Sequence, residues 1–308
     1  MRSKLRIPPL ILFAIAATSC DPSGTEPTTH PADPTASQSY AVSISAETTP
    51  PTLSNPSRVI ERSQDFSSNQ RNPTTTISGP PIWTLDNSLI LKNENVEHAL
   101  SRIEKPGIPA FDRSANTWFA SANGTLVRIH NGSLTVVADN IQGIDIDVRS
   151  TAGIAVSREP NDTIVLHKLG KHPGAALVLL TGPGFHYPRF SPDGKSVLVS
   201  ESHPNGSRIW VSTLDGNARV LASGDFPTWH PDGSSVVFVR VTSDGYSLRS
   251  SEVWAAQLKT GEERIVGPVS VPAISPSLSP DGTKIAFSDG RDGGLYWATY
   301  ADPFAGGR

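Results

Sequence analysis

The chain has 308 residues, of which 37% are apolar and 18% charged, and it contains 27 Pro, 25 Gly and a single Cys. A typical soluble domain has about 45–50% apolar and about 25% charged residues, so part of this chain does not build a hydrophobic core. One cysteine excludes a disulfide framework and a zinc site with several thiolates, and a net charge of -3 argues against binding nucleic acid through its phosphates.

The first nineteen residues have the three parts of a secretory signal. Arg2, Lys4 and Arg6 form a basic start, an apolar run follows over residues 7–17, and small residues lead up to Cys20. The apolar run is too short to span a bilayer. We therefore expect residues 1–19 to be removed as a signal peptide. Without its three basic residues the chain has 23 basic and 29 acidic residues, a net charge of -6.

The lone cysteine directly follows this signal. The segment Ala17-Thr18-Ser19-Cys20 resembles a bacterial lipobox, which implies lipidation of Cys20. Two or three acyl chains hold a protein stably on a membrane, since each buried methylene contributes about 0.8 kcal/mol. We expect a lipid-anchored protein of the cell envelope on the extracytoplasmic side, in the periplasm or on the cell surface. The alternative is an incidental cysteine in a released soluble protein.

Residues 20–80 are expected to form a disordered tether. Pro, Ser and Thr occupy 30 of the 60 positions from 21 to 80. Such a segment cannot bury enough apolar surface to offset the entropy lost on ordering its backbone.

From residue 81 to 308 the pattern changes to short apolar strands separated by Asn-Gly and Asp-Gly, which are strong hairpin signals. No convincing amphipathic helix is present, so this part is predicted to be an all-β domain. The predicted strands are Thr125–Ile129, Ser133–Ala138, Gly153–Ser157, Thr163–Lys168, Ala175–Leu180, Ser196–Ser200, Val236–Val241 and Lys284–Ser288.

One pattern recurs three times in this domain, over Phe190–Ser200, Trp229–Val239 and Leu278–Ser288. Its prolines are 39 and 49 residues apart. A repeat of 40–50 residues with four short strands is typical of a β-propeller blade. Each copy is followed by a tryptophan, and we expect Trp210, Trp254 and Trp297 to form core between blades, with ligand stacking as the alternative.

The Pro-Asp-Gly of each copy has a structural interpretation. Proline fixes φ, the aspartate accepts backbone N–H bonds, and glycine adopts positive φ before the next strand. Calcium binding or catalysis by the aspartates is the alternative. These turn residues are Pro192, Asp193, Gly194, Pro231, Asp232, Gly233, Pro280, Asp281 and Gly282.

The three copies resemble the TolB-type propeller repeat, found in the Tol translocation protein and in the propellers of prolyl-oligopeptidase-like enzymes. Weaker units at Ile82–Ile90, at Pro109–Asp112 with the strands after it, and at Ile144–Leu180 bring the total to six. We therefore expect a six-bladed TolB-like β-propeller, closed by N-terminal strands near residues 82–103 beside the last unit. The Tol protein has an N-terminal α/β domain where this chain has the tether, so no partner-binding residue is transferred from it.

Motifs for chemistry are absent from the sequence. There is no Gly-x-Ser-x-Gly, no His-Glu-x-x-His and no calcium loop with its terminal Glu. His186, His203 and His230 are interpreted as solvated loop residues, although propeller ligands can converge from successive blades. We therefore predict no catalytic residue, no metal and no cofactor.

The sequence thus favours a non-catalytic binding or scaffold propeller. Its expected partner is an envelope protein or a cell-wall polymer, with no nucleic acid, and the protein is expected to be a monomer. The alternative is a propeller enzyme of the lactonase or glycan-cleaving type, with its site at the channel mouth.

Overall fold

The computed structural model describes residues 57–58, 82–83, 85, 87, 89–90, 94–104, 106–170, 174–243, 248–269, 272–291 and 294–305. The predicted signal peptide, Cys20 and the predicted tether, apart from residues 57–58, lie outside this set. These predictions therefore stay predictions.

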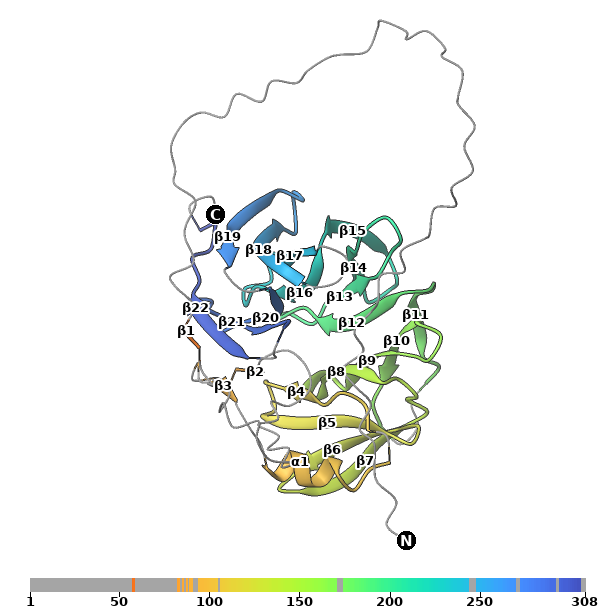
Figure 1. Ribbon diagram of the computed structural model, residues 1–308. Coiled ribbons are helices and arrows are strands. Elements are labelled where there is room, and N and C mark those ends of the chain that lie inside the picture. The colour runs from red at the N-terminus through yellow and green to blue at the C-terminus, as the bar shows by residue number, and fades with distance from the viewer. Residues whose placement is uncertain are drawn as a thin grey trace, which may run out of the picture.

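The described chain forms a ring of five four-stranded antiparallel sheets, the blades of a propeller (Figure 1). Blade 1 consists of β4 (Ala110–Asp112), β5 (Thr117–Ala122), β6 (Thr125–His130) and β7 (Ser133–Asp139). Blade 2 consists of β8 (Asp145–Arg149), β9 (Ile154–Arg158), β10 (Ile164–Lys168) and β11 (Leu177–Leu180), and a short 3-10 turn at Ser150–Ala152 follows β8. Blade 3 consists of β12 (Phe185–Phe190), β13 (Ser196–Glu201), β14 (Arg208–Thr213) and β15 (Ala218–Ser223). Blade 4 consists of β16 (Asp225–Trp229), β17 (Ser235–Ser243), β18 (Leu248–Gln257) and β19 (Glu263–Val269). Blade 5 consists of β20 (Ala273–Leu278), β21 (Lys284–Asp289), β22 (Leu295–Thr299) and β1 (Ser57–Arg58).

The first strand of each blade, which we call the inner strand, lies at the centre of the ring (Figure 1). These strands are β4, β8, β12, β16 and β20. β8 contacts β4 and β12, β16 contacts β20, and a hydrogen bond from the Trp229 indole joins β16 to β12. The hydrophobic core lies between blades. For example, Leu198 and Ile209 of blade 3 pack with Val236 and Phe238 of blade 4. All eight strands predicted from the sequence are present, with their ends within two residues of the expected positions.

The prediction of six blades is wrong for the described residues, because the unit at Ile82–Ile90 is a two-stranded hairpin and not a blade. Its strands are β2 (Ile82–Trp83) and β3 (Leu89–Ile90). The chain then forms the helix α1 (Glu94–Leu100), where a third strand would be needed. Val96 and Ala99, three residues apart, bury one face of this helix against the core of blade 1.

The β2–β3 hairpin nevertheless occupies the sixth position of the ring, between β20 and β4 (Figure 1). The Trp83 indole N–H donates to the carbonyl of Ser277 on β20 at 3.0 Å, and the Trp83 carbonyl accepts from Arg113 Nε after β4 at 3.3 Å. The Trp229 indole on β16 likewise bonds the Arg189 carbonyl on β12 at 3.1 Å. The hairpin therefore joins the last blade to the first, with its tryptophan in the role of an inner-strand tryptophan.

The fourth strand of blade 5 comes from a different segment than expected. Ser57 pairs with Trp297 and Arg58 with Tyr296, so β1 covers the outer edge of β22. The sequence predicted strands at residues 82–103 for this role, whereas residues 57–58 fall inside the predicted tether. An open edge strand invites pairing with other chains, and here an N-terminal strand covers part of that edge.

Candidate functional site

The three Pro-Asp-Gly turns connect inner strands to second strands, and each aspartate bonds within its own turn. Asp193 accepts from Ser191 Oγ at 2.6 Å and from the Lys195 N–H at 3.1 Å. Asp281 makes the matching bonds to Ser279 at 2.6 Å and to Thr283 at 3.0 Å. The hydrogen bond from Ser191 is the main reason that the pKa of Asp193 lies below its usual value.

The turn of blade 4 differs because His230 stands where the other two copies have serine. His230 Nδ1 lies 2.7 Å from Asp232 Oδ1, which also accepts from the Ser234 N–H at 2.8 Å.

The glycines of the three turns, Gly194, Gly233 and Gly282, have φ of 71°, 75° and 70°.

Successive turns approach one another closely. A Cβ on Gly233 would lie 3.7 Å from Pro192 Cδ, and one on Gly282 would lie 3.1 Å from His230 Nε2. Gly282 therefore gives both a left-handed backbone and room for the preceding turn, whereas at Gly233 the contact is ordinary and the positive φ alone favours glycine. In the part of the chain that the structure describes, no three His, Cys, Asp or Glu side chains are grouped so as to hold a metal ion.

The three tryptophans of the third strands are half-buried rather than core residues. A cation from the same blade lies over each indole ring: the distances to the ring centroid are 5.7 Å for Arg208 at Trp210, 4.1 Å for Arg240 at Trp254 and 5.4 Å for Lys284 at Trp297. Trp210 and Trp254 pack against core clusters that join neighbouring blades, but the partial exposure of all three indoles corrects the prediction that they form inter-blade core. Each cation covers a face of its indole ring, and a ligand would need such a face for stacking.

The inner strands of blades 3, 4 and 5 share an unusual backbone. Tyr187, Phe226 and Ser275 have φ of 53°, 50° and 51°, and each directly precedes a proline. The strand pairing shifts at the same place in all three blades. Non-glycine residues at positive φ cost energy, and bulges of this kind redirect side chains, often at binding sites. The three residues are half-buried on strands that face the centre of the ring.

An ion pair between blades 2 and 3 supports the first of these bulges. Asp145 Oδ1 lies 3.1 Å from Arg189 Nη1, and Asp145 Oδ2 accepts from the Tyr187 N–H at 2.7 Å. The Asp145 side chain is 1% exposed and that of Arg189 23%. Arg189 also donates to the carbonyls of Pro188 at 2.7 Å and Ile146 at 3.3 Å. Asp145 thus holds both the arginine and the strained backbone of Tyr187.

Further charges lie beside this pair, and we call Arg113, Asp145, Asp147 and Arg189 the axial cluster. Burial raises the pKa of Asp147, although Arg189 and the N–H of Phe190, 2.8 Å from Asp147 Oδ2, oppose this effect. Burial alone would lower the pKa of Arg189, but Asp145 and Asp147 outweigh it and raise that pKa. Burial lowers the pKa of Arg113, with Asp147 acting against it. The two acids therefore keep Arg189 charged.

Aromatic rings lie next to the axial cluster. The centroids of Tyr187 and Phe226 are 6.3 Å apart, and those of His186 and Tyr187 are 4.9 Å apart. Burial raises the pKa of Tyr187 and lowers that of His186, which favours neutral rings at neutral pH. We call Tyr187, Phe226 and His186 the aromatic rim. Rim and cluster together offer apolar surface beside fixed charges.

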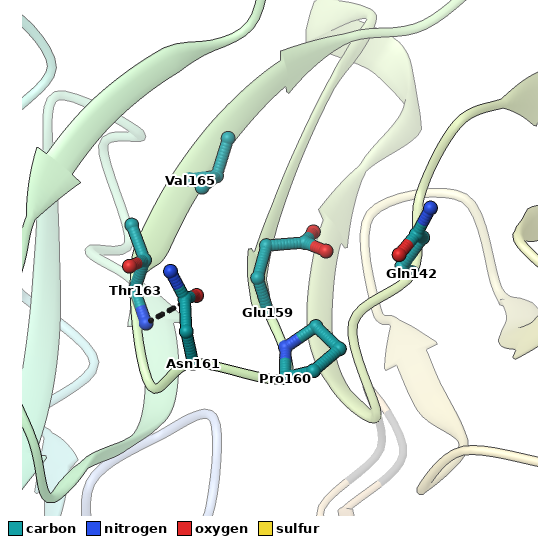
Figure 2. A pocket seen from close by; sticks show the side chains of 6 residues that line it. All are labelled: Gln142, Glu159, Pro160, Asn161, Thr163 and Val165. Carbon is teal, nitrogen blue, oxygen red and sulfur yellow. Dashed lines mark hydrogen bonds between the residues drawn. The ribbon is translucent and has the colours of Figure 1, made fainter.

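Separately, an open hollow with a volume of about 380 Å³ lies on blade 2, lined by Gln142, Glu159, Pro160, Asn161, Thr163 and Val165 (Figure 2). Behind it, the Ser157 hydroxyl lies 2.6 Å from Glu159 Oε1 and 2.8 Å from His167 Nε2. Glu159 Oε1 lies 3.4 Å from the same His167 nitrogen. A catalytic triad needs serine and acid on opposite ring nitrogens, and Ser157 is fully buried. This trio therefore lacks the geometry of a hydrolase triad.

Of the three histidines singled out in the sequence, only His186 joins the rim. His230 lies in its turn with Asp232, and His203 Nδ1 accepts from the Asn205 N–H at 3.2 Å. Neither the bulges nor the axial cluster was predicted from the sequence. One signal for the bulges was available, because Pro188, Pro227 and Pro276 each stand four residues before the proline of a Pro-Asp-Gly turn.

Comparison with known proteins supports the resemblance that the repeats suggested. No family model matches the chain. A 111-residue segment is 32% identical to the Tol-Pal system protein TolB of Rickettsia felis, which amounts to 34% of this chain and 24% of that protein. Over that segment the chain is similar to a TolB protein, which agrees with the resemblance of its repeats.

Solved structures of similar arrangement include two TolB proteins. A putative TolB from Agrobacterium tumefaciens is 17% identical, with 68% of each chain covered and a TM-score of 0.45. TolB from Acinetobacter baumannii is 16% identical, with 63% of this chain and 54% of that chain covered and a TM-score of 0.46. Among the residues described, no helix has the length and apolar character needed to cross a bilayer.

Proposed function

We propose that this protein is a non-catalytic binding propeller of the cell envelope, anchored through a lipid on Cys20, that holds a protein partner at the aromatic rim. The observation that carries the proposal is the repeated bulge that brings Tyr187 and Phe226 together beside the axial cluster. Rigid aromatic side chains beside fixed charges are typical of residues that dominate binding energy at protein interfaces.

The name of the Rickettsia relative places that protein in the Tol-Pal system, and this agrees with an envelope role for the present chain. The matched segment spans about a quarter of that relative, so its partners are not assigned here. The axial cluster also fits binding better than catalysis. Its two aspartates are engaged by Arg189 and by backbone N–H groups, whereas acid–base catalysis needs a group free to exchange a proton with a substrate.

Partner capture tests the rim directly. We expect Tyr187→Ala combined with Phe226→Ala to reduce recovery of the partner at least about tenfold in a crosslinking pull-down from the native envelope, because truncated hot-spot residues cost about 2 kcal/mol or more. Val136→Ala is the matched control, since Val136 is 57% exposed on the outer strand β7. Equal recovery with the double variant and the wild type would show that the rim does not bind the partner.

Fractionation tests the anchor. We expect Cys20→Ser to move the protein from the membrane fraction to the soluble fraction, because the acyl chains would be lost together with their attachment point. The wild-type protein, run in parallel, should stay with membranes after a high-salt wash. If the variant also stays with membranes, Cys20 is not the anchor.

A further inference from the structure

The hollow on blade 2 is formed by two rigid segments. One is the β9–β10 turn, in which the Asp162 N–H donates to the Glu159 carbonyl at 2.9 Å and the Glu159 N–H donates to the Thr163 carbonyl at 2.9 Å. Proline at position 160 fixes φ, and Asp162 adopts φ of 61°. Asp162 is tied to blade 3, because its Oδ2 accepts from the Gly184 N–H at 3.0 Å. The turn is therefore held in one conformation by its own hydrogen bonds and by the bond to blade 3.

The other segment is the loop that enters β8 and carries Gln142. A Cβ on Gly143 would lie 2.5 Å from Ser157 Cβ, so the loop lies directly on β9. The Ile141 N–H also donates to the Gly124 carbonyl of blade 1 at 3.0 Å. Figure 2 shows the Glu159 carboxylate between Gln142 on one side and Asn161 on the other.

The carboxylate of Glu159 is a fixed acceptor that keeps its charge. Burial alone would raise its pKa, but hydrogen bonds with His167 and Ser157 outweigh burial and lower it, helped by the Gln142 backbone. A carboxylate has about four acceptor positions, and the two groups placed by distance, Ser157 Oγ at 2.6 Å and His167 Nε2 at 3.4 Å, both lie against Oε1. Acceptor positions on Oε2 are therefore left for a ligand hydroxyl.

The amide of Asn161 is a donor oriented by one hydrogen bond. Its Oδ1 accepts from the Thr163 N–H at 3.3 Å, as the dashed line in Figure 2 marks, so its NH₂ group is the part available to a ligand. Asn161 is exposed, and Pro160 and Val165 add apolar surface to the lining. An acceptor and an oriented donor on one small hollow match two neighbouring hydroxyls, of which one donates and the other accepts.

From this arrangement we propose that the blade 2 hollow is a carbohydrate subsite that binds two neighbouring hydroxyl groups of a hexose unit, through Glu159 and Asn161. The site is separate from the aromatic rim, so a glycan and a protein partner would be bound by different residues. Because the hollow is open, the ligand is one unit of a longer chain rather than an enclosed small molecule.

The experiment titrates the purified protein with cellotetraose, whose units carry neighbouring free hydroxyls, and follows backbone amide shifts by NMR. We expect saturable shifts at residues 142, 159 and 161–163, since Pro160 has no backbone N–H. Glu159→Gln should weaken binding at least about tenfold, because a hydrogen bond to a charged group is lost. Asn161→Asp keeps the acceptor for the Thr163 N–H but replaces the NH₂ donor, and should weaken binding to a similar extent.

Controls separate this proposal from folding and from the rim. Leu177→Ser on the exposed outer strand β11 should bind like the wild type, and melting curves establish that each variant is folded. Glu159→Gln should leave partner capture at the rim intact. Absence of shifts up to the solubility limit, equal affinity for wild type and both variants, or shifts only with a lysine-containing peptide would each overturn the carbohydrate assignment.

Discussion

Replacing Asp145 by alanine is expected to lower the free energy of unfolding by about 3 kcal/mol. Removing one partner of a buried ion pair typically costs about 3–5 kcal/mol, and the lower end applies because Arg189 is 23% exposed. The change also leaves the Tyr187 N–H, now 2.7 Å from Asp145 Oδ2, without its acceptor. Chemical denaturation followed by tryptophan fluorescence measures the loss.

The conservative variant separates charge from geometry. Asp145→Asn can still accept from the Tyr187 N–H but does not neutralise Arg189, so we expect a smaller loss than with alanine. Partner capture should follow the same order, since Asp145 supports the bulge that places Tyr187 in the rim. If the alanine variant is as stable as the wild type, the ion pair does not hold blades 2 and 3 together.

Local turn chemistry was readable in the sequence, whereas contacts between blades were not. The Pro-Asp-Gly copies predicted the hairpins at Asp193, Asp232 and Asp281, because each turn is made by adjacent residues. Asp145 and Arg189 are 44 residues apart, and no spacing rule relates an acid on one inner strand to an arginine on the next. The axial cluster could therefore be identified only from the structure.

Closure of the ring shows a second limit of prediction from the sequence. A two-residue strand has no period, so Ser57–Arg58 could not be distinguished within a segment rich in Pro, Ser and Thr. The unit at Ile82–Ile90 was predicted at the correct residues but was expected to have more strands than it has. Its tryptophan and turn resemble those of the blades, and it differs from a blade only after residue 93, where a helix replaces the third strand.

The sixth position gives a second large effect, because one residue, Trp83, connects blades 5 and 1 there through its side chain and its backbone carbonyl. Trp83 is 2% exposed, and its indole N–H bonds the Ser277 carbonyl of blade 5, while its carbonyl accepts from Arg113 of blade 1. We expect Trp83→Ala to lower the free energy of unfolding by about 3–5 kcal/mol, the usual cost of removing a large buried aromatic side chain. Thermal and denaturant unfolding measure it.

Trp83→Phe is the matched control, because it retains most of the apolar volume while it removes the indole donor and part of the ring. A loss of about 1–2 kcal/mol is then expected, from one hydrogen bond and the smaller ring. Trp83→Ala should also open the ring where blades 5 and 1 meet. Limited proteolysis of this variant should therefore cut between residues 83 and 110 before it cuts blades 3 and 4. If the alanine and phenylalanine variants unfold alike, the hairpin packs on the ring without closing it, and the five blades are stable without a sixth element.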